Sequence, residues 1–355
     1  MKILVIRVSA IGDVIHTFPS IFLLKRLFPG CKISWVVQEK AVEILQGQTF
    51  LEEVFVLKNK FLRPKNWIHT LRVIKQLRSQ KWDLILDFQG ILKTSILLSF
   101  LKGAKFGFSK EHARDKFSTF FTKYHVEPVY KNIIQKNLAL VSDINLRCLF
   151  EQNINKEFLR KTPLFEDLKK DFNLTFFDRE KEIVDGWIAK NNLNKFMIVA
   201  PNTTWPSKHL PLQTWQDLLR RLAEKDLKVV LFGTFFGQPG IDLAKFCAKE
   251  KLKIFIPSKL NLNQTAYLIS KSDLLIGPDT GLVHLADFLQ IKTISIFGPT
   301  MASVHGPFVR VENIENAIQI PCFHYRQKVH GKNNSENCMA KLSVDEILQR
   351  IDLVK

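Results

Sequence analysis

Apolar and polar residues fall into two periodic patterns along the chain, one typical of buried strands and the other of helices. A run of apolar residues fills Ile3–Ile6 and predicts a buried strand over Lys2–Arg7. A loop over Val8–Asp13 comes next, and helical spacing of apolar residues extends over about Val14–Phe28. Pro29-Gly30 then predicts the end of this helix. The chain therefore opens with a strand, a loop and a helix.

The same two patterns recur in both halves of the chain. In the first half they predict strands over Lys32–Val37 and Trp82–Asp87, with a basic helix around Trp67–Arg78 between them. In the second half they predict a helix over Leu212–Lys225 and strands over Phe196–Ala200, Lys228–Gly233, Lys253–Ile256, Leu274–Gly277 and Thr293–Phe297. Strands that alternate with helices predict parallel sheets covered on both faces, so the fold class is α/β.

The chain is long enough for two domains. Its 355 residues are 46% apolar, which suffices for two hydrophobic cores. The charged stretch Phe150–Arg179 shows no clean strand, so we place a first domain at 1–171 and a second at 172–355. A last amphipathic helix is predicted over Ser343–Val354, with Ser343 as its cap and Glu346 completing a capping box. This helix could pack back on the first domain.

The sequence predicts a protein of the cytosol. It has no run of about 18 or more apolar residues, so we expect no membrane-spanning helix. Arg7 interrupts the first apolar stretch, which argues against a secretion signal. Cysteines are few and widely spaced, which suits a reducing compartment, and none is an obvious nucleophile. They are Cys31, Cys148, Cys247, Cys322 and Cys338.

Positive charge is concentrated in the first half of the chain. The formal net charge is +18, and residues 1–150 hold 24 Lys and Arg against 11 Asp and Glu, a balance of +13. The other 205 residues hold 28 against 23, a balance of +5. Such a field attracts nucleic acid, an acidic membrane leaflet or a phosphorylated substrate. A generally lysine-rich composition would also explain it.

The loop after the first strand carries the first candidate chemistry. Gly12 permits close approach to the backbone, and Asp13 stands at the start of the following helix. Asp13 could cap that helix, or it could project toward a ligand and act as a general base if its pKa were raised. His16, one turn later, is either a packing residue or a ligand contact.

A second loop, Gly277–His284, opens a helix directly after a predicted strand. Asp279 can accept hydrogen bonds from sugar hydroxyls, and the backbone N–H groups of Thr280, Gly281 and Leu282 suit a diphosphate at a helix N-terminus. The alternative is a tight turn with Asp279 as the helix cap. His284 could touch either the diphosphate or the core.

Two further segments could bind anions. In the loop Ala200–Pro211, Lys208 is a compact cation suited to a leaving diphosphate, and Thr203 and Thr204 can donate to phosphate oxygens. Its three prolines could equally make this loop structural. Gln89, Lys93 and Arg114 stand in or after a strand end of the basic half. They suit an acidic acceptor, although solvated surface charge explains each of them as well.

Metal-capable side chains gather near the end of the chain. Cys322, His324, His330 and Cys338 could hold zinc, but neither a CxxC pair nor an HxxxH spacing is present. We therefore expect no metal site.

Together these motifs resemble the ADP-heptose glycosyltransferases that build the inner core of lipopolysaccharide, glycosyltransferase family 9. The resemblance extends from Lys2 through Gly12–Pro19 and Asp87–Lys93 to Gly277–His284 and Phe297–Thr300. Within the family the first two motifs are most similar to the enzymes that add the first heptose, to Kdo. The Cys322–Cys338 segment looks more like other branches.

The resemblance implies a GT-B fold, in which two Rossmann-like domains face each other across a cleft, and an inverting transfer of heptose from ADP-heptose to Kdo-lipid A. The first domain would bind the acceptor and the second the nucleotide sugar. No cofactor would be required. Asp13 would be the general base and Lys208 would face the diphosphate. The donor would contact Thr203, Thr204, Leu260 (near the adenine), Asp279, Thr280, Gly281, Leu282 and His284. The acceptor would contact Gly12, His16, Gln89, Lys93 and Arg114.

The implied place of action is the inner face of the cytoplasmic membrane, where the enzyme would lie as a peripheral protein on an anionic surface. Alternatives within enzymes are transfer onto the first heptose, as by the second heptosyltransferase, or use of another nucleotide sugar. A non-catalytic sugar-nucleotide-binding protein is a further alternative. A basic nucleic-acid-binding protein is an alternative from charge alone, but the sequence shows no recognition motif for nucleic acid.

Overall fold

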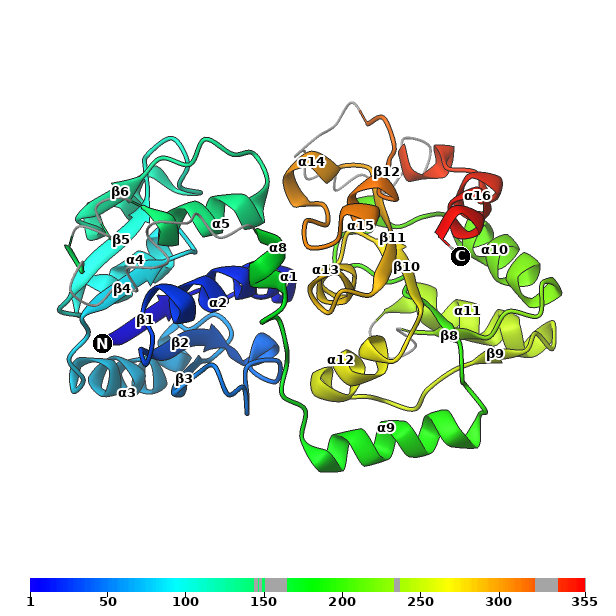
Figure 1. Cartoon of the computed structure of the whole chain (residues 1–355), viewed down its shortest axis with the longest axis horizontal. Coiled ribbons are helices and arrows are strands. Elements are labelled where there is room, and N and C mark those ends of the chain that lie inside the picture. The colour runs from blue at the N-terminus through cyan, green and yellow to red at the C-terminus, as the bar shows by residue number, and fades with distance from the viewer. Residues whose placement is uncertain (144–145, 147–148, 151–164, 233–236, 323–337, 355) are drawn as a thin grey trace. The chain divides into compact units, whose positions relative to one another are not determined.

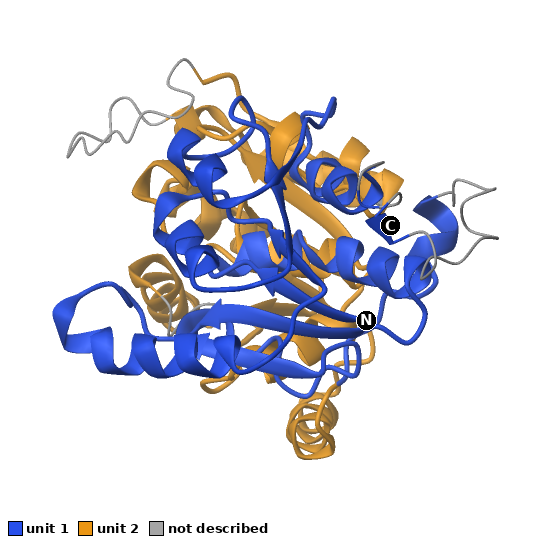
Figure 2. Cartoon of the chain, turned by 90° about the vertical axis from the view of Figure 1, so that its left-hand side faces the viewer, with its two compact units in different colours: residues 1–175 blue, residues 176–355 orange. Residues whose placement is uncertain are grey.

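The structure, a computed structural model, divides into two compact units. It describes residues 1–143, 146, 149–150, 165–232, 237–322 and 338–354. The first unit is Met1–Thr175 and the second is Phe176–Lys355, coloured separately in Figure 2. The boundary that we predicted, between residues 171 and 172, lies a few residues before this division. The ligands assigned to the two domains stay predictions.

The first unit is built on a parallel sheet of six strands in the order β3-β2-β1-β4-β5-β6 (Figure 1). Their bounds are β1 Lys2–Ile6, β2 Lys32–Gln38, β3 Glu53–Leu57, β4 Leu84–Asp87, β5 Ala104–Phe108 and β6 Tyr124–Val126. β1 lies at the centre, where Ile3 pairs with Ile33 of β2 and Leu84 of β4. Because β1 is covered on both faces, its residues Ile3 to Ile6 are all buried.

Helices cover both faces of this sheet. They are α1 Ile11–Ile15, α2 Phe18–Leu27, α3 Trp67–Arg78, α4 Leu92–Ser99, α5 Ile133–Ser142 and α8 Phe165–Lys169, with short 3₁₀ turns η1 Glu39–Ala41, η2 Pro64–Asn66 and η3 Lys116–Phe121. Phe18 of α2 meets Trp35 of β2 edge to face at 6.0 Å. α3 and α4 pack on the opposite face, where Val73 and Leu97 join one core cluster with Val36.

The second unit repeats this architecture with the strand order β12-β11-β10-β7-β8-β9, all parallel. Its strands are β7 Met197–Val199, β8 Val229–Leu231, β9 Ile254–Phe255, β10 Leu274–Pro278, β11 Lys292–Phe297 and β12 Ile318–Gln319. Its helices are α9 Asp178–Lys190, α10 Leu212–Glu224, α11 Gln238–Lys249, α12 Leu262–Ser270, α13 Gly281–Phe288, α14 Ala302–His305, α15 Val311–Glu315 and α16 Val344–Val354, with 3₁₀ turns η5 Pro206–Lys208 and η7 Cys338–Lys341.

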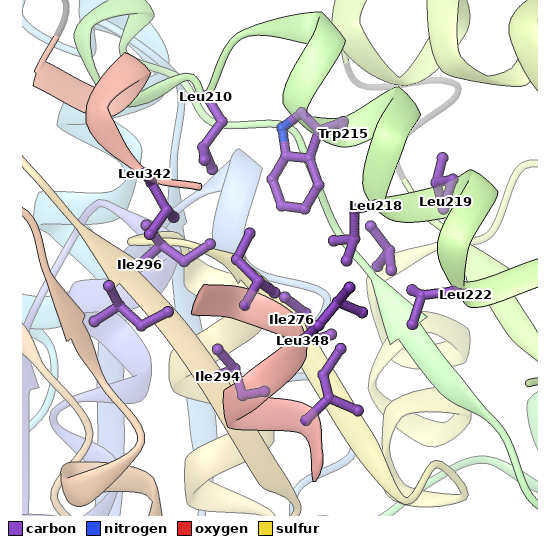
Figure 3. Close-up of a cluster of buried hydrophobic side chains, with 14 of the residues drawn as sticks. Leu210, Trp215, Leu218, Leu219, Leu222, Ile276, Ile294, Ile296, Leu342 and Leu348 are labelled. Carbon is purple, nitrogen blue, oxygen red and sulfur yellow. The ribbon is translucent and has the colours of Figure 1, made fainter. Parts of the chain in front are cut away.

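One face of the second sheet carries a large apolar core. Figure 3 shows Trp215 of α10 close to Leu210 and Leu218, with Ile294 and Leu348 farther along the same cluster. α16 thus buries its apolar side within the second unit, on α10 and β11. Its contact with the first domain stays a prediction. Its predicted cap is present, because the Ser343 hydroxyl accepts a hydrogen bond from the Glu346 N–H at 3.2 Å.

The predicted α/β class, with two units of Rossmann type, is confirmed. The helix predicted over Val14–Phe28 is instead two helices, α1 and α2. Pro19 lacks a backbone N–H and cannot continue the helical hydrogen-bond ladder. The Thr17 hydroxyl donates a hydrogen bond to the Asp13 carbonyl at 3.0 Å. Among the described residues, no helix combines the length and apolar character that crossing a membrane requires.

Gly277 lies near the end of β10, two residues before Asp279, and lets β10 approach the end of β7 closely. A Cβ atom at this position would lie 2.8 Å from the Ala200 carbonyl oxygen, which belongs to the backbone and cannot move away cheaply. We expect Gly277→Ala to lower the free energy of unfolding by about 1–3 kcal/mol. Urea denaturation would measure the change, with Gly186→Ala as the control because a Cβ at Gly186 meets nothing within 4 Å.

Candidate functional site

Three loops meet beside the central strands of the first unit. β1, β4 and β5 are neighbours in the sheet, so the loops at their carboxyl ends lie at one edge, where parallel sheets bind ligands. Asp13, the third residue of α1, is held there by two arginines. Arg7 Nη2 lies 2.9 Å from one carboxylate oxygen of Asp13, and Arg114 Nη1 lies 3.3 Å from the other. The Ala10 N–H also donates to this carboxylate, at 3.2 Å.

Arg7 is the buried member of this cluster, with 2% of its side chain exposed. It follows β1 directly, and it also donates a hydrogen bond to the Phe88 carbonyl at the end of β4. The Trp35 indole N–H donates to the Arg7 carbonyl at 3.0 Å, which fixes the backbone on the other side. Arg7 therefore ties β1, β2 and β4 to the helix that presents Asp13.

These contacts set the charge state of Asp13. Burial raises its pKa, but Arg7 and then Arg114 oppose this effect, and the pKa falls to about 2. The raised pKa that we took as the condition for a general base is therefore not met. Asp13 is also not the N-cap of α1, which is Ala10. Its carboxylate stays ionised throughout the physiological pH range.

Gln89 has a structural role in this loop cluster. It is buried, and its side-chain oxygen accepts hydrogen bonds from Val8 N at 2.9 Å and Ser9 N at 3.3 Å. The Asp87 carboxylate in turn accepts from the backbone of Gln89 and Gly90 at 3.0 and 3.1 Å, and burial raises its pKa. Gln89 thus shapes the loop before Asp13, and its contact with an acceptor stays a prediction.

The other residues that we predicted for the acceptor differ in access. His16 is buried, and its backbone carbonyl accepts from Asn137 of α5 at 3.0 Å. Gly12 is half-buried beside Asp13, whereas Lys93, in the first turn of α4, is exposed. Arg114 is mostly exposed. The structure therefore brings Gly12, Asp13 and Arg114 together at an accessible place and leaves His16 in the interior.

The second unit holds an equivalent cluster around Asp279, just after β10. Lys208 Nζ donates to one carboxylate oxygen at 2.6 Å, and the Thr300 hydroxyl donates to the same oxygen at 2.7 Å. His284 Nε2 lies 2.9 Å from the other oxygen. β7, β10 and β11 are neighbours in the sheet, so these residues again come from three adjacent strand ends or from the helix that follows. Lys208 also lies 5.2 Å above the Trp205 ring.

Asp279 is not the cap of α13, which begins after the N-cap residue Thr280. Only 7% of Asp279 is exposed, and although burial raises its pKa, the contacts with His284 and Lys208 lower the pKa far below its usual range. Thr280 is the N-cap residue of α13 and makes no side-chain cap bond. The Thr280 hydroxyl oxygen is buried, and no described residue hydrogen-bonds to it. The first N–H groups of α13 have no acceptor within the helix, so this end suits an anion.

The remaining predicted donor contacts lie in the loops after β7 and β9 and in the first turn of α13. The Thr203 carbonyl contacts His209 Nε2 at 2.8 Å, and Thr204 is exposed. Gly281 and Leu282, in the first turn of α13, are half-buried. Leu260 is half-buried after β9, next to Asn261, which caps α12. β9 lies at the sheet edge, two strands from β7.

Two residues of these clusters were not identified from the sequence. Arg7 was interpreted only as the end of an apolar stretch, although a charged residue directly after a buried strand stands where a site forms. Thr300 was part of the Phe297–Thr300 motif, but nothing local indicated its contact with Asp279. Arg7 pairs with Asp13 only six residues later, whereas Thr300 lies 21 residues after Asp279 in the chain.

The described residues include no group of three or more His, Cys, Asp and Glu side chains that could hold a metal ion. Of the four residues that we weighed for zinc, Cys322 and Cys338 are buried free thiols. Burial and the neighbouring Cys322 thiol raise the pKa of Cys338 to about 12. His324 and His330 lie outside the described residues.

A model of glycosyltransferase family 9 (heptosyltransferase) matches residues 70–333, which is well over half of the chain. The chain belongs to glycosyltransferase family 9. It is similar to lipopolysaccharide heptosyltransferase 1 of Pseudomonas aeruginosa, with 27% identity over 91% of this chain and 85% of the relative. The enzyme of that name from Campylobacter coli is 26% identical over 84% of each chain.

The solved structure titled E. coli heptosyltransferase WaaC with ADP matches all of both chains, with a TM-score of 0.74 and 20% identity. This likeness shows a shared fold, so the family 9 protein has the GT-B architecture of two Rossmann-like units that the sequence predicted. Family membership also makes it a glycosyltransferase.

The contacts of Asp13 in this family 9 enzyme predict a pH dependence of stability. The pKa of Asp13 is about 2 in the folded protein and 3.8 for an ordinary aspartate, as in the unfolded chain, so ionised Asp13 stabilises the fold above pH 4. The contribution, roughly 2 kcal/mol in full, is lost as the pH falls through 2. We expect the unfolding free energy of the native chain to fall between pH 5 and pH 3 by about 1 kcal/mol more than that of Asp13→Asn.

Urea denaturation at the two pH values measures this difference. Asp226→Asn is a matched control, because Asp226 is exposed and its variant should follow the native chain. An Asp13→Asn variant that loses as much stability as the native chain between pH 5 and pH 3 would contradict the lowered pKa.

Proposed function

We propose that this enzyme transfers heptose from ADP-heptose to the Kdo of Kdo-lipid A during synthesis of the lipopolysaccharide inner core, with inversion at the anomeric carbon. The observation that supports this proposal is an ionised carboxylate, Asp13, in one unit, and in the other Lys208 held by Asp279 directly before the N-terminus of α13. The names of the relatives, lipopolysaccharide heptosyltransferase 1, support the heptose and the first-heptose acceptor.

Asp13 would accept the proton of the attacking acceptor hydroxyl. A base with a pKa of about 2 is too weak to deprotonate a free hydroxyl efficiently, because general base catalysis is most effective when the pKa of the base lies near the working pH. In glycosyl transfer, however, the sugar cation forms early and the hydroxyl becomes strongly acidic as the new bond develops. A weak base that is always ionised then suffices, provided that it is held in place. Arg7 holds it.

The second unit would bind the donor diphosphate. The free N–H groups at the start of α13 and the Thr280 hydroxyl would donate to phosphate oxygens. Lys208 would meet the negative charge that develops on the leaving ADP. Asp279 holds the Lys208 ammonium group, and His284 contacts the other carboxylate oxygen of Asp279. The structures of the E. coli enzyme titled with ADP and with ADP-2-deoxy-2-fluoro heptose support this donor.

We propose that the reaction needs no metal or other cofactor. Lys208 and the α13 N-terminus supply the positive charge that a divalent cation supplies in many nucleotide-sugar sites. A chelator such as EDTA should therefore leave the transfer rate unchanged.

The proposed acceptor is a lipid, so the enzyme would act as a peripheral protein at the inner face of the cytoplasmic membrane, and nucleic acid would not be a partner.

Asp13→Asn tests the proposed chemistry. We expect kcat for transfer from ADP-heptose to Kdo-lipid A, read by mass spectrometry, to fall by roughly 10²–10⁴-fold, because the hydroxyl proton loses its acceptor. The Kd for ADP should stay unchanged. Arg7→Met/Asp13→Asn repeats the test without an unpaired buried arginine, and Asp226→Asn is the surface control. Native activity in both Asp13 variants would refute the assignment.

The same assay decides the acceptor. Kdo-lipid A and its singly heptosylated product are offered in parallel, and we expect transfer only to the first. Transfer only to the second would assign the enzyme to extension of the first heptose. No transfer from ADP-heptose, with transfer from another nucleotide sugar, would reject the proposed donor.

Lys208→Met tests the donor site. We expect kcat to fall more than KM for ADP-heptose rises, since the charge on the leaving diphosphate is greatest in the transition state. The loss should be roughly 10–100-fold, as for removal of a hydrogen bond to a charged group. Lys208→Arg should recover part of the activity. A purely structural Lys208 would instead show in the unfolding curve and leave the kcat of the folded fraction unchanged.

A further inference from the structure

Helix α3 of the first unit has an apolar outer face that no other described element covers. Its inner side buries Thr70, Val73, Ile74 and Leu77 against the sheet. On its outer side, Ile68 is 78% exposed, Leu71 is 63% exposed and Trp67 is 55% exposed. Large apolar side chains one turn apart on a solvent-facing helix indicate an interaction surface.

This outer face is held in a fixed shape. The Trp67 indole N–H donates to the Leu62 carbonyl at 2.8 Å, which anchors the ring against the turn before α3. Leu62 is itself exposed beside it. The Thr70 hydroxyl donates to the Phe61 carbonyl at 2.8 Å and fixes the same turn from the buried side. The apolar group is therefore preorganised on the folded unit.

Positive charge surrounds the apolar group without any negative charge in the same stretch. Residues 54–82 contain eight Lys and Arg and no Asp or Glu. Arg63 and Lys65 precede the exposed apolar residues, and Arg72, Lys75 and Arg78 follow them on α3, all exposed. An apolar face with Trp and Leu, flanked by Lys and Arg, is the pattern of helices that lie in the interface of an anionic bilayer.

A second feature of the same kind lies on η3. Phe120 is 80% exposed and Phe117 is 64% exposed, beside the exposed Lys116. Phe121 packs against the core cluster that also contains Val73 of α3, so η3 and α3 cover the same face of the sheet. η3 begins two residues after Arg114, which pairs with Asp13.

We propose that the outer face of α3, Trp67, Ile68 and Leu71 with its flanking Arg and Lys residues, docks this enzyme on the anionic surface of a phospholipid bilayer. The proposal rests on the proposed function only for its purpose, which is to bring the enzyme to a lipid acceptor. A second copy of the chain fits this face poorly, because a twofold contact would set two such basic stretches against each other. Nucleic acid would match the charge but leave Ile68 and Leu71 without an apolar partner.

The test is binding of the full chain to vesicles that contain no lipopolysaccharide precursor. Flotation with phosphatidylethanolamine and phosphatidylglycerol vesicles, and with neutral phosphatidylcholine vesicles, gives the partition of the protein. We expect binding to the anionic vesicles, and Ile68→Ser/Leu71→Ser should weaken it by roughly tenfold or more, because both apolar side chains would insert. Val311→Ser/Ile314→Ser on α15 is the matched control, since these residues are 55% and 45% exposed, and it should bind as the native chain does.

Three results would overturn the proposal. The first is that the native chain does not bind anionic vesicles, and the second is that Ile68→Ser/Leu71→Ser binds them as tightly as the native chain. The third is that Arg72→Glu/Lys75→Glu weakens binding while Ile68→Ser/Leu71→Ser does not. The last result would show charge attraction without insertion, and tighter binding to a DNA or RNA duplex than to vesicles would favour nucleic acid. Unfolding curves should show both serine variants folded, because the changed side chains are exposed. The vesicles hold no acceptor, so a failed transfer assay would reject the proposed function and leave this result standing.

Discussion

The ion pair between Arg7 and Asp13 sets the geometry of the first unit's site. Arg7 has almost no contact with water, so its charge needs a partner, and Asp13 and the Phe88 carbonyl are the acceptors that its guanidinium reaches. Removing one charge of a buried pair typically costs about 3–5 kcal/mol, because the other is left uncompensated. The pair therefore couples the end of β1, the end of β4 and the first turn of α1 into one arrangement. A displacement of any of them would break the pair.

The second unit solves a similar problem with a longer network. Asp279 is buried after β10. Lys208 and Thr300 approach its carboxylate from the segments after β7 and β11, and His284 approaches from α13. Each partner comes from a different element, so the carboxylate positions the ammonium group of Lys208 relative to the free end of α13. In both units a buried carboxylate joins adjacent strand ends. In the first unit the carboxylate is proposed to accept a proton, and in the second it is proposed to orient Lys208 toward the leaving diphosphate.

The sequence predicted the parts of this structure that depend on local pattern. Runs such as Ile3–Ile6 identified the central strands, and the rule that parallel strands bind ligands at their carboxyl ends selected the loops of Asp13 and Asp279. Short outer strands such as β6, of three residues with His125 exposed, give no such signal. The low pKa of Asp13 was not predicted, because the contact with Arg7, six residues earlier, was missed and Arg114 is 101 residues away in the chain. The hydrogen bonds that Gln89 accepts from Val8 and Ser9, about 80 residues earlier, could not be predicted for the same reason.

The low pKa of Asp13 is consistent with an anionic acceptor. A carboxylate or phosphate brought near Asp13 would raise its pKa, because two negative charges at short distance favour protonation of one of them. An aspartate that began with a raised pKa would then bind a proton at neutral pH and could accept none from the hydroxyl. Arg7 and Arg114 lower the pKa of Asp13 to about 2, so an upward shift of roughly 1–3 units would still leave its carboxylate ionised at neutral pH. The mostly exposed Arg114 can also pair with the arriving anion, while the buried Arg7 stays with Asp13. Two arginines with different exposure would thus allow the proposed anionic acceptor and the proposed base, Asp13, to share one site.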